Sequence, residues 1–326
     1  MNLLLSLAFV LCWSSGFIGA KLGAGSAPAT TVLMWRFLPL IVLLLVFSAT
    51  RASTLRHRLT WRVVGRQSLI GLLSQSGYLL TVYYAIQLGV PSGTTALIDG
   101  VQPLVAGALA GPLLRQTVAP RQWLGLCLGA AGVAAVTTAD ASAGTAETWW
   151  AYLIPFLGMF SLVAATFLEN RSRTPVAAST SMTIHSLTSA VLFTALAVGT
   201  GTTAPPADVT FWVAVIWLVA LPTFGGYGLY WLILKRSGVT KVNALMFLMA
   251  PVTVVWGVLM FGEPLSLQTV LGLAVALTAV AVVHRGGRAS GRTAGTADAA
   301  QEEPFRTPAD PHGPTNQTLV TQHLAK

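Results

Sequence analysis

The chain of 326 residues is 54% hydrophobic and only 9% charged, with a mean hydropathy of +0.70. Ordinary soluble domains carry about 25% charged residues, so this composition excludes a water-soluble protein of this size and indicates a body that lies in lipid. The net charge of +9 does not indicate nucleic-acid binding, because no basic face with interleaved aromatic residues stands apart from the apolar stretches.

Ten apolar stretches are long enough to cross the ~30 Å hydrocarbon core of a bilayer, for which a helix needs about 20 residues. The segment 285–326 is rich in Gly, Thr, Ala, Pro and charge, and we expect it to be a disordered cytoplasmic tail. The sequence therefore predicts an all-α integral membrane protein with ten transmembrane helices. In chain order the predicted spans are residues 3–20, 30–48, 64–87, 92–112, 122–139, 149–168, 177–199, 209–234, 242–261 and 267–284.

Positively charged residues collect in alternate connections between these spans. Of the 19 lysines and arginines, all but Lys21 and Arg36 lie in or beside the second, fourth, sixth and eighth connections, or in the segment 285–326. Basic residues mark the cytoplasmic loops of membrane proteins. The pattern therefore predicts a multi-pass protein of the bacterial plasma membrane with both termini in the cytoplasm.

The two halves of the chain match each other in the same order, at an offset of about 148 residues. We expect repeats of five spans each over 1–140 and 147–284. Because five is odd, the second copy would enter the membrane from the opposite side, and such inverted repeats are typical of secondary transporters. Chance matching between two segments rich in Leu, Ala and Gly is the alternative. The matches are Gly77-Tyr78 with Gly226-Tyr227, Ala96-Leu97 and Pro103 with Ala244-Leu245 and Pro251, and Leu124–Leu126 with Leu271–Leu273.

Several stretches across residues 3–284 carry a family resemblance: Trp13–Lys21, Arg36-Phe37, Tyr84-Ala85, Ala96–Pro103, Ala244–Pro251, Gly262–Leu265 and Gly272. In this order and spacing they resemble the EamA-type ten-span carriers of the drug/metabolite transporter superfamily. The resemblance implies a plasma-membrane carrier, often an exporter of amino acids or related metabolites, with no organic cofactor. The family's Gly-Glu turn stands at Gly262-Glu263 in the second half, whereas the first half has Gly111-Pro112 instead.

Asp99 lies within the fourth predicted span and is the sharpest candidate for a functional residue. At 3-4-3 spacing it shares one helix face with Ser92, Thr95 and Gln102, and this face should line the bundle interior or a water-filled cavity. Pro103 disfavours regular helix just before it, and broken helices offer carbonyl groups to ligands in carriers. Because a charge in lipid costs about 2.5–3.5 kcal/mol, Asp99 is a candidate for substrate binding or proton exchange.

Arg36 is a second charge within a predicted span. Counted from the outer face, Arg36 is about six residues into the second span and Asp99 about seven residues into the fourth, so both lie about 9–11 Å deep at 1.5 Å per residue. We therefore expect the two side chains to approach each other, or to share a substrate carboxylate and amine. A structural ion pair and a direct role in substrate or proton handling both remain open.

His185 lies within the seventh predicted span, on a stripe with Ser181 and Thr188. The pattern fits a histidine that packs between helices through a hydrogen bond, and it also fits a proton relay or a ligand contact. No second His, Cys or carboxylate stands at ligand spacing beside it, so we expect no metal.

Aromatic residues near the middle of the spans could line a substrate pocket, although interfacial belts use the same residue types. Tyr78 is the better pocket candidate, whereas Tyr83 and Tyr84 could belong to a belt. The candidates for a substrate or proton pathway are Trp13, Phe17, Arg36, Gln75, Tyr78, Thr95, Asp99, Gln102, His185, Tyr227 and Asn243. The candidate helix kinks or hinges are Pro103, Pro222, Gly225, Gly226 and Pro251.

The function that these features favour is a secondary transporter. It would move a small metabolite, such as an amino acid or a related compound, across the plasma membrane by alternating access, in the direction of export and with proton coupling as an option. The alternative is an intramembrane enzyme or a channel, but the sequence contains no HExxH or GxSxG motif and no paired intramembrane carboxylates. The expected partners are the substrate and the lipid bilayer. Small-residue spacings such as Gly19/Gly23 fit close packing within the bundle or a homodimer face.

Overall fold

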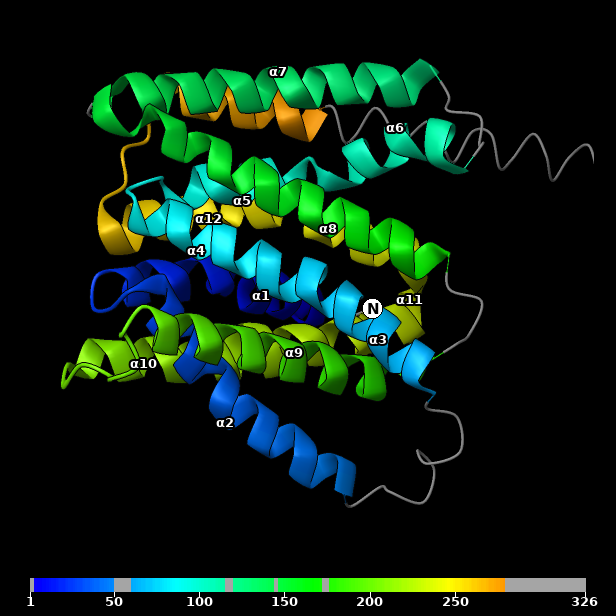
Figure 1. The fold of residues 1–326 in the computed structure, drawn as a ribbon. Helices are drawn as coiled ribbons and strands as arrows, with labels where there is room; N and C mark the ends of the chain where they lie inside the picture. Colours follow the sequence, from blue (N-terminus) through cyan, green and yellow to red (C-terminus); the bar gives the residue numbers. More distant parts are fainter. Residues whose placement is uncertain (1–2, 50–59, 115–119, 144–145, 172–175, 279–326) are drawn as a thin grey trace, which may run out of the picture. The chain divides into compact units, whose positions relative to one another are not determined.

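The computed structural model describes residues 3–49, 60–114, 120–143, 146–171 and 176–278, and every regular element in these ranges is a helix (Figure 1). Three of the elements are not α-helical: η1 and η3 are π-helical and η2 is a 3₁₀ helix. The elements are α1 (Leu3–Ala24), α2 (Ala29–Ala49), α3 (Trp61–Gly71), η1 (Leu72–Gly77), α4 (Tyr78–Gln87), α5 (Ser92–Gly100), α6 (Gln102–Leu114), α7 (Pro120–Ala143), η2 (Ala146–Leu153), α8 (Ile154–Asn170), α9 (Ala178–Gly199), α10 (Val209–Leu218), η3 (Val219–Gly226), α11 (Tyr227–Met246) and α12 (Met249–Phe261). A further helical segment covers Leu267–Thr278.

Helices occupy most of the described part of each of the ten predicted spans, and seven spans are long and apolar enough to cross a membrane. The fourth predicted span falls short because it is divided at Val101 into α5 and α6. The ninth contains the 13-residue helix α12, and the tenth is described only as far as Thr278. The all-helical membrane fold is thus confirmed, while the predicted tail at 285–326 lies outside the described residues.

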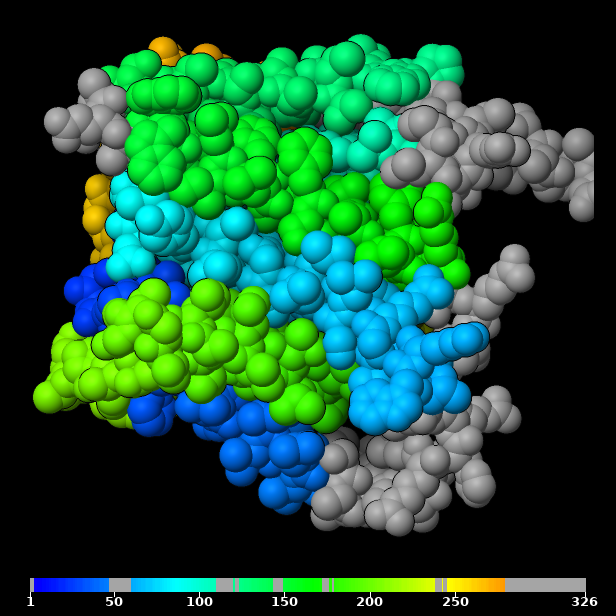
Figure 2. All heavy atoms as spheres, in the orientation of Figure 1, coloured from blue at the N-terminus to red at the C-terminus, as the bar shows by residue number. Residues whose placement is uncertain are grey.

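The seven long spans are Leu3–Ala24, Ala29–Val46, Trp61–Gln87, Trp123–Ser142, Trp149–Asn170, Ser179–Gly199 and Val209–Ser237. Large apolar side chains project outward from them, including Leu157 on α8, Val191 on α9 and Ile216 on α10. Figure 2 shows one face of the molecule, on which α8, α4 and α9 lie side by side. In a soluble protein such a surface would be unfavourable, whereas in a membrane protein lipid covers it.

The helix boundaries differ from the expected ones in the second half. The sequence analysis placed the eighth connection at Lys235–Lys241, but α11 remains helical from Tyr227 to Met246. The interruption comes at Phe247 and Leu248 instead, before α12. Lys and Arg are good helix formers, so a basic stretch marks a side of the membrane without marking the end of a helix.

The two prolines expected to kink their spans lie just after helix interruptions. Pro103 is the second residue of α6, and Pro251 is the third residue of α12. A proline in the first turn of a helix loses no hydrogen bond, because the first amide groups have no partner within the helix. The chain therefore breaks two to four residues before each proline, at Val101 and at Phe247-Leu248.

Spans three and eight share an unusual feature, because each contains a π-helical segment that ends in a Gly-Tyr pair. In the third span η1 ends at Gly77, and in the eighth η3 ends at Gly226. The segment η3 also contains Pro222 and Gly225, two of the predicted hinge residues. π-Helical turns and prolines are the usual causes of a bend in a long helix, so both spans are irregular near their middle.

Candidate functional site

A cavity of about 180 Å³ lies between α1, α2, α4, α5, the start of α6, α8, η3 and the break between α11 and α12. The third span reaches it through η1 as well as α4. The cavity brings together predicted pathway residues from five of the spans. Those that line it are Trp13, Phe17, Arg36, Gln75, Tyr78, Asp99, Gln102 and Tyr227. Of the predicted hinge residues, Pro103 and Pro222 also line it.

Arg36 is almost completely buried, with 6% of its surface exposed. From α2 its guanidinium reaches two other spans: Nη1 donates to the hydroxyl oxygen of Tyr83 at 2.6 Å, and Nη2 donates to Oγ1 of Thr223 in η3 at 3.2 Å. The Nε–H of Arg36 has no hydrogen-bond partner. The side chain is therefore held in place by α4 and η3 and still has one donor to offer.

Asp99 occupies the last turn of α5, just before the break at Val101. Its Oδ2 accepts a hydrogen bond of 2.5 Å from the hydroxyl of Tyr78 in α4, and its Oδ1 is buried without a partner. A buried polar atom without a partner costs about 1–3 kcal/mol, so such an atom in a cavity marks a place where a ligand or water can bind.

The predicted structural ion pair between Arg36 and Asp99 does not form: neither of these two described side chains has an ion-pair partner, and both line the same cavity. Each is held by a different tyrosine of α4, Arg36 by Tyr83 and Asp99 by Tyr78. Because Arg36 Nε and Asp99 Oδ1 are still unpartnered, both groups are available to a third partner.

The rest of the cavity wall is aromatic and polar. The rings of Trp13 and Tyr227 pack against each other with centroids 5.2 Å apart. Gln75 accepts a hydrogen bond from Ser189 at 3.1 Å through Oε1, and the amide of Gln102 lies 3.5 Å from Oγ1 of Thr166. The wall can therefore contact both an apolar body and charged or polar groups.

Two described pathway residues, Thr95 and His185, do not line this cavity. Thr95 is fully buried one turn before Asp99, where its hydroxyl donates to the carbonyl oxygen of Pro91 at 3.1 Å. His185 packs against α3, and its Nε2 lies 2.8 Å from Oε1 of Gln67. Asn243 lies in α11, but its side chain is outside the described residues. The position of His185 favours the packing role over the relay.

The close approach of α9 to α3 depends on a glycine. A Cβ at Gly71 would lie 2.7 Å from the Cα of His185, so a side chain at this position would separate the two helices. The amide of Gln67 in turn donates to Oε2 of Glu169 at 3.3 Å, and so links α9 to α8 through α3.

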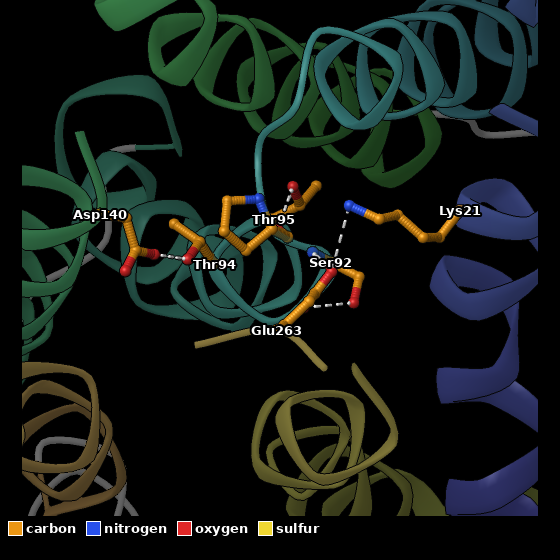
Figure 3. Close-up of polar contacts among 7 residues, drawn as sticks. Lys21, Ser92, Thr94, Thr95, Asp140 and Glu263 are labelled. Atoms are coloured by element: carbon orange, nitrogen blue, oxygen red, sulfur yellow. Dashed lines mark hydrogen bonds and ion pairs between the residues drawn. The ribbon is translucent and has the colours of Figure 1, made fainter. Parts of the chain in front are cut away.

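Two features of the structure were not expected from the sequence. Tyr83, which could have belonged to an interfacial belt, is 2% exposed and binds Arg36. Lys21 and Glu263 looked like ordinary residues at span ends and in loops, yet their side chains form an ion pair at 3.5 Å (Figure 3). The Gly-Glu turn of the second half is the sequence signal that could have pointed to Glu263.

Long apolar helices around a cavity lined by charged groups define a multi-pass membrane protein with an internal cavity. Residues 1–138 and 148–285 match the sequence profile of the EamA-like transporter family, so the chain belongs to this family and is a membrane transporter.

Individual relatives agree with the family. The chain is 26% identical over 285 residues to the uncharacterized inner membrane transporter YedA of Escherichia coli strain K12, covering 86% of this chain and 89% of that protein. The YedA proteins of strains O6:H1 and O157:H7 match to the same extent. A protein of known crystal structure has the same fold, with a TM-score of 0.57 at 19% identity, over 86% of this chain and 95% of that one.

Proposed function

We propose that the protein is a secondary carrier that exports a small amphipathic metabolite bearing both a carboxylate and an amine, such as an amino acid with an apolar side chain. The observation that supports this proposal is the pairing of two unsatisfied groups on one cavity. Arg36 offers an unpartnered Nε–H and Asp99 an unpartnered Oδ1. A carboxylate would bind the first and an ammonium group the second, through charge-assisted hydrogen bonds.

The size and chemistry of the cavity support a small substrate. Drug-sized ligands occupy pockets of about 300–1,000 Å³, whereas this cavity measures about 180 Å³. Trp13, Phe17 and Tyr227 present aromatic surface to it. An apolar side chain of the substrate would be buried against these rings, and the binding of its two charged ends would fix its orientation.

Transport by alternating access would use the interrupted spans as hinges. Carriers built from inverted repeats bind their substrate where broken helices meet near the middle of the membrane. Here the breaks at Val101 and Phe247, together with η1 and η3, all border the cavity. The matching positions of η1 and η3 in the two halves support the inverted repeat, with each half rocking against the other around the site.

Proton exchange at Asp99 is a second element of the proposal. Its support is the burial of the carboxylate together with the unpartnered Oδ1, because an unpaired charge in this position is costly. A proton on Asp99 would remove that cost after the substrate amine has left. In that case a pH gradient across proteoliposomes should drive uptake in the absence of any other ion gradient, and a gradient that has no effect would exclude coupling.

The test starts from cells that contain or lack the protein. The proposal predicts that an apolar amino acid or a close relative accumulates inside cells that lack the carrier. The same compound, radiolabelled, should enter proteoliposomes that contain the purified protein faster than protein-free liposomes. If no zwitterionic compound changes in the cells and none is transported in liposomes, the proposed substrate class is wrong.

A further inference from the structure

At one end of the cavity three residues form a cluster that joins the two halves of the chain. We call Lys21, Ser92 and Glu263 the ion-pair clamp (Figure 3). Glu263 Oε1 lies 3.5 Å from Nζ of Lys21 and accepts a hydrogen bond of 2.9 Å from the backbone N–H of Ser92. Oε2 of Glu263 accepts a second bond, of 3.0 Å, from the hydroxyl of Ser92. Lys21 and Ser92 belong to α1 and α5 in the first half, whereas Glu263 follows α12 in the second half.

The backbone at the end of α12 aims Glu263 at α5. Gly262 has a left-handed conformation, with φ of 63°, and its N–H donates to the carbonyl of Val258 at 3.0 Å. The N–H of Glu263 returns to the carbonyl of Gly257 at 3.2 Å, which completes the glycine-terminated cap that ends many helices. The turn thus presents the Glu263 carboxylate to the N-terminus of α5, where unpaired amide groups and the helix dipole favour a negative charge.

The clamp stands beyond the limit of the cavity. On α1 the wall residues end at Phe17, four residues before Lys21, and on α5 they begin at Ala96, four residues after Ser92. The residues between the clamp and the nearest wall residues of the cavity are tightly packed: Thr95 of α5 and Thr253 of α12 are both 0% exposed. At this end the cavity is therefore closed by α1, α5 and α12, and the clamp ties these three elements together.

We propose that Glu263 is a positioning residue for transport, and that the ion-pair clamp holds the cavity closed on the outer side of the membrane. The proposal rests on the carrier function proposed above. By binding the first residue of α5, Glu263 sets the position of the helix that carries Asp99, seven residues or about 10 Å further along. An opening toward this side has to separate α12 from α1 and α5, and so has to break all three contacts.

The chemistry of the clamp suits a contact that opens and closes. The Lys21 side chain is 25% exposed, so water can solvate its ammonium group when the pair separates. The connection 262–266 contains no Lys or Arg, which places it outside the cell by the positive-inside rule. In the sequence the carboxylate has no counterpart in the first half, because the residue 148 positions before Glu263 is Arg115. The clamp therefore stabilises closure at one end only.

A cysteine placed just below the clamp tests the proposal. The chain has two cysteines, Cys12 and Cys127, and replacing both with alanine provides a background for the reporter Ala96→Cys. Ala96 lines the cavity and is 1% exposed. Its rate of reaction with a membrane-impermeant thiol reagent is then measured from the outside in right-side-out vesicles and from the inside in inverted vesicles.

Glu263→Gln keeps an oxygen for Ser92 but loses the ion pair, and Lys21→Met removes the pair from the other side. We expect each change to increase the outside labelling rate roughly tenfold, because the loss of the ion pair shifts the population toward the outward-open state. The double variant should label no faster than the faster single variant, because both remove the same interaction. Inside labelling should stay equal or fall.

Asp208→Asn is the matched control, because Asp208 also lies at this end, where it accepts a hydrogen bond from Ser26 at 2.8 Å. It should leave the labelling rate unchanged, and thermal unfolding of each purified variant in detergent checks that the fold is retained.

Unchanged outside labelling in Glu263→Gln would overturn the proposal, as would an equal increase in Asp208→Asn. If Glu263→Gln does not fold, Lys21→Met decides alone. The labelling experiment requires no substrate, so it tests the clamp independently of the proposed substrate. If the clamp variants label as expected but the protein transports no zwitterion, only the proposed substrate class is wrong.

Discussion

The two halves of the chain both contribute walls to the same cavity, and the two sets of wall residues differ in chemistry. The first half supplies the charged and amide groups, from Arg36, Gln75, Asp99 and Gln102. The second half supplies mainly apolar surface, and its wall residues are Leu162, Pro222, Tyr227, Met246, Phe247 and Met249. If the two halves are repeats, as proposed, then their scaffold is repeated without its polar groups. The proposed amphipathic substrate would then bind in one orientation, with its charged ends toward the residues of the first half.

The backbone features of the two halves agree much better than their side chains. Both halves have a π-helical segment, η1 and η3, and further along the chain a helix break before a proline, at Val101 and at Phe247-Leu248. At the offset of 148 residues that relates Pro103 to Pro251, the counterpart of Asp99 is Phe247 and that of Gln102 is Ala250. In the proposed carrier the irregular helices would serve movement in both halves, whereas the charged groups that bind the substrate would be needed only once.

The largest effect is expected from Asp99→Asn, which removes the carboxylate from the polar wall and keeps its shape. The amide can still accept the hydrogen bond from Tyr78, so the fold should be retained. Losing a charge-assisted hydrogen bond to the substrate costs about 1.5–3 kcal/mol, which corresponds to roughly a 10- to 100-fold fall in kcat/KM for proteoliposome uptake.

The control for this variant is Asp140→Asn, since Asp140 is a buried carboxylate outside the cavity that accepts a hydrogen bond from Thr94. Its transport should stay close to wild type. Normal transport by Asp99→Asn would show that Asp99 has a structural role only. The difference in charge between the wall residues of the two halves would then have no effect on substrate binding.

A second effect concerns the scaffold, where α3 of the first half meets α9 of the second. In Gly71→Ala the new Cβ would lie 2.7 Å from the Cα of His185, and overpacking of this kind costs about 1–3 kcal/mol. The melting temperature in detergent should fall. Gly65→Ala in the same helix has nothing within 4 Å of its Cβ, so it should melt at or above the wild-type temperature. Equal melting of the two variants would show that α3 and α9 do not approach as closely as described.

A smaller effect separates the two repeat-related tyrosines. Tyr78→Phe removes the hydroxyl that donates to Asp99, and a hydrogen bond to a charged group contributes about 1.5–3 kcal/mol. We expect KM to rise by roughly tenfold, because Asp99 is no longer held in position. Tyr227→Phe keeps the ring that packs against Trp13 and should change KM by no more than about twofold. An equal rise in KM in both variants would show that the hydroxyl of Tyr78 is no more important for substrate binding than that of Tyr227.

The smallest effect concerns Asp208, which caps the N-terminus of α10. Hydrogen bonds from the backbone N–H of Thr210 and from Ser26 lower the pKa of this exposed carboxyl below its ordinary value of 3.8. A lowered pKa in the folded state stabilises the protein above the ordinary value, and this contribution is lost as the pH falls through the folded pKa. The melting temperature of Asp208→Asn should therefore lie slightly below wild type at pH 7, and the difference should vanish once the pH has fallen through the lowered pKa of the folded state. A difference that persists in acid would exclude this charge as its cause.

Hydropathy alone was sufficient to predict the helices, because a spanning segment needs a long apolar run and the bilayer admits few other structures. Arg36 and Asp99 stood out for the same reason, since ionisable residues within such runs are rare. Depth counted along the helices brought both residues to one cavity but could not show that each is hydrogen-bonded to a different tyrosine of α4. That arrangement depends on how α4 is rotated, which hydropathy does not specify.

The ion-pair clamp was beyond prediction for a different reason. Lys21 and Glu263 lie at the ends of spans, where charged residues are common and carry little information. Their contact joins residues far apart in the sequence, and it depends on the left-handed turn at Gly262. The π-helical segments were missed as well, although Gly77-Tyr78 and Gly226-Tyr227 marked their ends, because one extra residue in a helical turn leaves no hydropathy signal.

The most direct test of the proposed substrate site is a comparison of three competitors in one uptake assay. Proteoliposomes take up a radiolabelled apolar amino acid in the presence of the unlabelled amino acid, of the amine that lacks its carboxylate, or of the acid that lacks its amine. If Arg36 and Asp99 bind the two ends of one substrate, the complete amino acid should compete at least about tenfold better than either partial compound, because each charged contact contributes about 1.5–3 kcal/mol. If the amine or the acid alone competes as well as the complete amino acid, the site does not bind both charged groups of the substrate.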